Sequence, residues 1–69
     1  MIIEKMRVSL SSNEIKMGVE GYYYCDLGSI KIPEHCLEEL EFCQNENLNV
    51  FLLQDSEDKS RFYYLGLNP

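Results

Sequence analysis

The chain alternates hydrophobic and polar positions in several short runs and follows a helical period in one segment, residues 33–46. Apolar side chains recur there at the spacing of one side of a helix: Cys36, Leu37, Leu40 and Cys43. Pro33 suits a first helical position, because its φ is fixed near the helical value and its missing N–H needs no partner there. We therefore predict one helix over residues 33–46, with a narrow apolar stripe and acidic residues on its other sides.

Before this helix, a period of two predicts short strands. Residues 2–10 alternate, a polar turn follows at 11–13, and the alternation then resumes with Ile15, Met17 and Val19 on one face. Gly21 leaves two readings, a tight turn into a third strand or a bulge within one long strand. We favour the turn. Residues 30–32 are expected to be an extended entry into the helix, because a proline follows them.

After the helix, three asparagines within residues 45–49 are candidates for a left-handed cap. Residues 50–53 are the most apolar run and predict a central strand, followed by a loop at 55–59 and a returning strand at 60–67. Two or three strands, one helix and two further strands indicate an α+β fold. We expect a small antiparallel sheet of four to five strands with the helix packed on one face. All 69 residues are assigned to one domain.

The negative charge is concentrated in the second half of the chain. Twelve acidic and six basic residues give a net charge of −6. Residues 1–31 balance, whereas residues 32–58 carry carboxylates and no Lys or Arg. Such a field repels nucleic acid and anionic membranes and attracts basic protein surfaces. With no secretory signal and no apolar run near the ~20 residues of a membrane span, a cytoplasmic protein without direct nucleic-acid or membrane binding is expected.

No catalytic or metal-binding pattern emerges from the residue types that could provide one. Cys25, Cys36, Cys43 and the single histidine, His35, lack the paired spacings of metal sites. The thiols are expected to be reduced and buried as small apolar groups. Carboxylates in residues 55–58 lack the ligand spacing of a calcium loop. We expect a protein that is not an enzyme and that uses neither a metal nor a cofactor.

Carboxylates around an aromatic residue make the helix the leading candidate for a protein-binding surface. Phe42 falls on the outer side of the predicted helix, where it either tucks under the following loop or contacts a partner. Together with the acidic loop, the predicted protein-binding residues are Glu34, Glu38, Glu39, Glu41, Phe42, Glu46, Asp55, Glu57 and Asp58.

The tyrosine-rich strands suggest a second surface. Aromatic residues fall on both faces of these strands, and one helix covers only part of a sheet. Either the exposed aromatics join two copies in a symmetric homodimer, or the sheet curls over its own tyrosine rings. The residues predicted for a ligand or dimer surface are Lys5, Arg7, Tyr22, Tyr24 and Tyr64.

These features predict a small acidic protein-interaction module, an inhibitor or regulator that binds the basic, nucleic-acid-binding surface of another protein as a nucleic-acid mimic. Phage anti-CRISPR and anti-restriction inhibitors share this size and charge, although no motif here identifies such a family. The alternative is a dimer that binds or sequesters a small ligand such as a nucleotide, using tyrosines with Lys5, Arg7 or Lys16. A structural subunit of a larger assembly is a third candidate.

Overall fold

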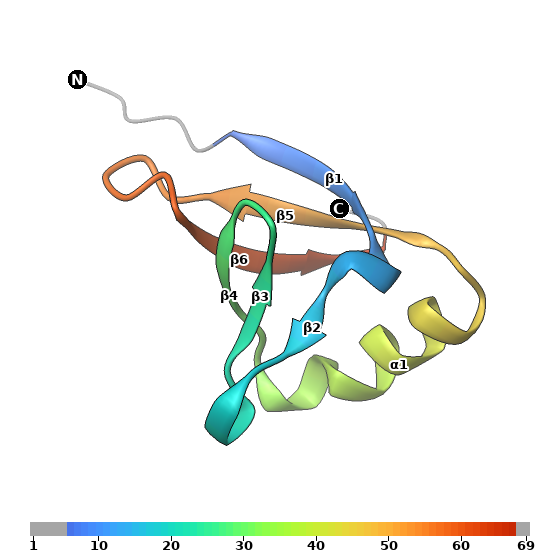
Figure 1. Cartoon of the computed structure of the whole chain (residues 1–69). Coiled ribbons are helices and arrows are strands. Elements are labelled where there is room, and N and C mark those ends of the chain that lie inside the picture. Colours follow the sequence, from blue (N-terminus) through green and yellow to red (C-terminus); the bar gives the residue numbers. More distant parts are fainter. Residues whose placement is uncertain (1–5, 68–69) are drawn as a thin grey trace.

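The computed structural model describes residues 6–67, in which one helix lies against a curled sheet (Figure 1). The strands are β1 (Arg7–Ser11), β2 (Lys16–Met17), β3 (Tyr23–Cys25), β4 (Gly28–Lys31), β5 (Asn49–Gln54) and β6 (Arg61–Gly66). The helix is α1 (Leu37–Asn45), and the short 3-10 turns are η1 (Ser12–Glu14), η2 (Val19–Gly21) and η3 (Glu34–Cys36). The predicted α+β class with a single helix is confirmed for this part of the chain.

The sheet differs from the prediction in the number and direction of its strands. It has six strands in the order β1-β5-β6-β4-β3-β2, where four to five were expected. Four neighbouring pairs are antiparallel, but β4 and β6 run parallel, so the sheet is mixed. The prediction of an antiparallel sheet is therefore wrong.

The unexpected strand is β4, which overlaps the predicted extended entry into the helix at residues 30–31 and begins two residues before it. Ile30 is buried and pairs with Phe62 of β6, whereas Ser29 and Lys31 are exposed on the opposite face. One buried position between two polar ones is too short an alternation to identify a strand. Parallel pairing also needs a crossover connection, and α1 with β5 supplies it here.

The core lies between one side of α1 and the inner face of the sheet. Leu40 and Cys43 of the predicted apolar stripe are buried, and Cys36 and Leu37 are half-buried. Alternate strand residues complete the core, since successive side chains of a strand point to opposite faces. These strand residues are Val8, Leu10, Tyr23, Cys25, Ile30, Val50, Leu52, Phe62 and Tyr64. The predicted interior position of residues 50–53 is confirmed, because β5 lies between β1 and β6.

The helix is shorter than predicted at its start and ends as expected. Pro33 has a φ of −61° but an extended ψ of 146°, so it precedes η3 and α1 begins at Leu37. At the other end, Asn47 has a φ of 56°. This left-handed conformation confirms that one of the asparagines after the helix reverses the chain direction.

The first strands agree with the pattern only in part. Residues 2–5 of the predicted first strand lie outside the described residues, and β1 begins at Arg7. Gly21 has a φ of 80° at the end of η2, which confirms a turn between β2 and β3. Met17 and Val19, predicted to share an apolar face with the buried Ile15, are exposed instead, because β2 is a two-residue strand at the sheet edge.

The turn η1 connects the two edge strands of the sheet and is tied to the end of the helix. The N–H of Ser12 donates to the carbonyl of Leu48 at 3.0 Å. Gln44 Nε2 of α1 donates to the carbonyls of Ser12 at 3.2 Å and Ile15 at 3.1 Å. Since β1 and β2 lie at opposite edges but are joined through η1, the sheet curls around the core (Figure 1). Tyr64 is buried, whereas Tyr22 and Tyr24 are exposed, so the curled sheet covers only part of the aromatic surface.

Candidate functional site

The outward side of η3 and α1 carries carboxylates around an aromatic ring. Glu38 and Glu46 lie four residues before and after Phe42, so they are its neighbours on the same side of the helix. The Phe42 side chain is 52% exposed, which excludes the reading that it tucks under the following loop. We define the helix surface as the exposed residues Glu34, Glu38, Glu41, Phe42 and Glu46.

Among the described residues, no basic side chain neutralises the carboxylates of the helix surface. Within residues 6–67, no Lys or Arg forms an ion pair with any of them. Glu39 has a different role, because its Oε1 accepts a hydrogen bond from the Tyr64 hydroxyl at 2.8 Å and so ties α1 to β6. The negative charge of the helix surface therefore faces outward, where it attracts cationic groups.

A groove of about 470 Å³ lies beside the helix surface, between α1 and the strands β2 and β3. Its lining is mostly apolar and consists of Ile15, Met17, Tyr23, Leu37, Leu40, Glu41 and Gln44. We call this the helix groove. Glu41 belongs to both the helix groove and the helix surface. A carboxylate beside apolar walls suits a Lys or Arg side chain, whose apolar stem and charged end need different surroundings.

The acidic loop between β5 and β6 is not part of the same surface. In Figure 1 this loop and α1 lie at opposite ends of the molecule. Asp55 Oδ1 accepts from the N–H groups of Glu57 at 2.8 Å and Asp58 at 3.2 Å, and its Oδ2 accepts from the Tyr63 hydroxyl at 2.9 Å. Hydrogen bonds from Ser60 lower the pKa of Asp58. Asp55 and Asp58 thus shape the loop, and the structure does not bring them together with the helix glutamates.

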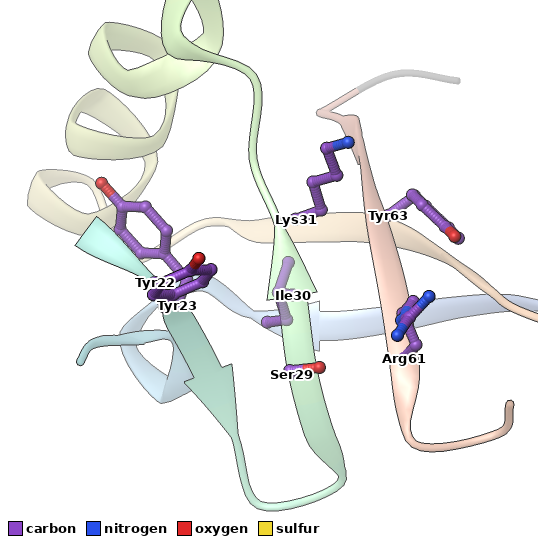
Figure 2. A pocket seen from close by; sticks show the side chains of 7 residues that line it. All are labelled: Tyr22, Tyr23, Ser29, Ile30, Lys31, Arg61 and Tyr63. Atoms are coloured by element: carbon purple, nitrogen blue, oxygen red, sulfur yellow. The ribbon is translucent and has the colours of Figure 1, made fainter. Parts of the chain in front are cut away.

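A second groove, of about 500 Å³, lies over β3, β4 and β6 (Figure 2). Lys31 and Tyr63 are register partners on β4 and β6, as are Ser29 and Arg61. Figure 2 shows the side chains of Tyr22 and Tyr23 on one side of β4 and those of Arg61 and Tyr63 on the other. We define the tyrosine groove by its lining residues Tyr22, Tyr23, Ser29, Ile30, Lys31, Arg61 and Tyr63.

The residues predicted for a ligand or dimer surface do not form one site. Tyr64 is 9% exposed and bonds to the helix, contrary to its predicted surface position, because the even-numbered side chains of β6 face inward. Tyr22 is 74% exposed and lines the tyrosine groove, and Tyr24 is exposed on β3. Arg7 is exposed on the edge strand β1, and Lys5 lies outside the described residues.

The homodimer stays a prediction. Exposed apolar side chains do gather near the edge strand β2, where a second copy would have to make its contact. They are Met17, Val19, Tyr22 and Tyr24.

Lys31, Arg61 and Tyr63 line a groove but were not predicted as site residues. The alternation of residues 60–67 contained part of the signal, because it places Arg61 and Tyr63 on the same face of one strand. The sequence did not place Lys31 beside Arg61 and Tyr63, because β4 was not predicted as a strand. Its partner β6 also lies far along the chain, beyond the helix.

The three cysteines are free thiols, with Cys25 and Cys43 buried and Cys36 half-buried. This placement agrees with their predicted apolar role. Within residues 6–67, no group of three or more His, Cys, Asp or Glu side chains is arranged to hold a metal ion.

No helix in the described part of the chain is both long and apolar enough to cross a membrane. The chain matches no protein-family model, and comparisons with curated proteins and with solved structures find no significant match. Its function therefore has to be inferred from the chemistry of its surfaces.

The buried contact between helix and sheet predicts a loss of stability at alkaline pH. Burial raises the pKa of the Tyr64 hydroxyl, and the Glu39 carboxylate raises it further, because an ionised phenol would face a negative charge. Burial also raises the pKa of the Cys43 thiol. A group with a raised pKa in the folded state stabilises the fold fully below its unfolded-state pKa, about 8.5 for Cys and about 10 for Tyr. We expect the free energy of unfolding to fall as pH rises above these values.

Denaturant unfolding between pH 7 and 11 measures this effect. Tyr64→Phe should make the decline above pH 10 shallower, although loss of the bond to Glu39 should lower stability by about 1 kcal/mol at neutral pH. Tyr24→Phe, a matched change at an exposed tyrosine, should leave the decline unchanged. Equal declines in Tyr64→Phe and the wild type would contradict the assignment.

Proposed function

We propose that this protein is a non-catalytic interaction module that binds a basic surface of another protein through the helix surface and the helix groove. The nucleic-acid-binding surfaces of proteins are basic because they neutralise phosphates. A protein that covers such a surface with carboxylates competes with nucleic acid for it. The molecule would then act as an inhibitor or regulator of a nucleic-acid-binding protein, and the analogy in size and charge with phage anti-CRISPR and anti-restriction proteins belongs to this proposal.

One observation carries the proposal. Glu38, Glu41 and Glu46 lie within four residues of the half-exposed Phe42 on α1 and its C-terminal cap, and Glu34 lies in the preceding turn η3. No Lys or Arg among residues 6–67 pairs with these carboxylates. Protein interfaces commonly combine an apolar or aromatic anchor with complementary charges around it. Here Phe42 supplies the anchor, and the adjacent helix groove offers apolar walls to a Lys or Arg of the partner.

The decisive experiment is competition with DNA for purified proteins that have basic clefts. A panel of CRISPR effector nucleases and restriction endonucleases would be loaded with fluorescent duplex DNA, and its displacement would be followed by anisotropy. We expect the wild-type protein to displace DNA from at least one panel member, with an affinity that falls steeply as salt is increased.

A matched pair of charge reversals locates the binding surface. Glu38→Lys changes the centre of the helix surface, whereas Glu57→Lys makes the same change of net charge in the loop at the other end of the molecule. Glu38→Lys should weaken competition by about tenfold or more, the effect of losing a close charge pair and adding a repulsion. Glu57→Lys should weaken it by less than about threefold. Equal effects, or no displacement from any panel member, would refute the proposal.

A further inference from the structure

The tyrosine groove has a charge opposite to that of the protein as a whole. Its lining includes Lys31 and Arg61 and no carboxylate, although Asp55 lies beside it and accepts a hydrogen bond from the Tyr63 hydroxyl at 2.9 Å. The chain as a whole has twelve acidic and six basic residues. Both cations are exposed and lie on adjacent parallel strands, Lys31 beside Tyr63 and Arg61 beside Ser29. Diagonal neighbours on paired strands are roughly 7–8 Å apart at their Cα atoms, so the two long side chains can reach one anionic group.

Aromatic side chains complete the groove. Tyr22, Tyr23 and Tyr63 all line it, and Tyr22 is 74% exposed. An exposed ring of this size offers a flat apolar face on which a planar ligand can stack. Tyr22 follows the turn η2, and its N–H donates to the carbonyl of Val19 at 3.3 Å.

We propose that the tyrosine groove binds a nucleotide, with the base against the exposed ring of Tyr22 and the phosphate held by Lys31 and Arg61. The Ser29 hydroxyl, on the same strand face, supplies a further hydrogen-bonding group. Each part of the ligand matches a different part of the lining, since aromatic rings bind bases and paired cations bind phosphates.

The size of the groove and the charge of the protein select a small ligand. A volume of about 500 Å³ is within the range of small-molecule sites. A nucleic-acid strand has a negatively charged phosphate at every nucleotide. The protein has a net charge of −6, so it repels such a strand. A single nucleotide brings few charges and can place them between the two cations. This site goes beyond the proposed protein-binding function: it uses none of the residues of the helix surface and shares only Tyr23 with the lining of the helix groove.

The test is a titration of the isotope-labelled full chain, followed by amide chemical shifts. The probes are the four common ribonucleoside 5′-monophosphates, with adenosine and inorganic phosphate as separate arms. We expect saturable shifts at the groove residues and an affinity for at least one nucleotide about tenfold or more above that for adenosine or phosphate. Equal affinity for phosphate alone would overturn the base-stacking assignment.

Variants within and outside the groove separate local contacts from net charge. Lys31→Gln and Arg61→Gln should each weaken nucleotide binding by about tenfold. Lys59→Gln, which removes an exposed cation outside the groove, should weaken it by less than about twofold. Equal weakening by all three variants would overturn the site, as would absence of shifts at the groove with every probe. If a single-stranded oligonucleotide binds more tightly than any mononucleotide, the proposed small ligand is wrong and the groove binds a nucleic-acid strand.

The two proposals fail independently. Glu38→Lys, which should weaken competition with DNA by about tenfold or more, lies outside the tyrosine groove and should leave nucleotide binding intact. Conversely, Lys31→Gln should leave competition with DNA intact.

Discussion

Replacing Gly28 with alanine is expected to destabilise the protein by about 3 kcal/mol or more, which is most of the stability of a chain of this length. A Cβ at Gly28 would lie 1.9 Å from the carbonyl oxygen and 2.6 Å from the carbonyl carbon of Ser60. Both are backbone atoms, so no side-chain movement relieves the clash. The backbone at this position also has a φ of 155°, and the next N–H, that of Ser29, donates to the same Ser60 carbonyl at 2.8 Å.

Gly21→Ala is the matched control for this substitution. Gly21 also has a positive φ, 80°, but a Cβ there would meet no atom within 4 Å. Only the conformational penalty of about 1 kcal/mol is therefore expected. Thermal and urea unfolding followed by circular dichroism compare the two variants. If Gly28→Ala is no less stable than Gly21→Ala, β4 does not approach the β5–β6 loop as closely as described.

Phe62→Ala is the second substitution with a large expected effect. The Phe62 side chain is 1% exposed and lies on β6 opposite Ile30 of β4, where the two parallel strands meet. Removing a buried phenyl ring of this kind lowers the free energy of unfolding by about 3–5 kcal/mol. We expect the variant to be largely unfolded at 25 °C, with lost dispersion of its amide resonances.

Phe42→Ala makes the same chemical change on the helix surface. Because Phe42 is half-exposed, this variant should keep the wild-type stability within about 1 kcal/mol. It should nevertheless weaken competition with DNA in the experiment described for Glu38→Lys, since the proposed anchor is removed. Similar unfolding free energies for Phe62→Ala and Phe42→Ala would contradict the burial of Phe62 in the core.

Local patterns predicted the parts of the fold that local contacts determine. The spacing of Leu40 and Cys43 identified the buried side of the helix, and the apolar run of residues 50–53 identified an interior strand. The asparagines after the helix supplied the left-handed residue Asn47. Each of these features depends on a few neighbouring residues, so a single sequence contains the information.

The features that the sequence did not predict depend on contacts between distant segments. β4 is a strand because β6 pairs with it, and only three residues of each strand are matched in register. Tyr64 is inside because it lies on the inward side of β6, where its hydroxyl donates a hydrogen bond to Glu39 of the helix. The tyrosine groove joins residues from β4 and β6, so its cations could be brought together only once that pairing was known.

The parallel contact between β4 and β6 is also a seam between two antiparallel halves, β1-β5-β6 and β2-β3-β4. Within each half, every strand has an antiparallel neighbour, whereas across the seam the strands share one short register. Lys31 belongs to one half and Arg61 to the other. A ligand bound to both residues would stabilise the pairing of the two halves. Local opening between β4 and β6 would then become rarer as more of the protein has the ligand bound.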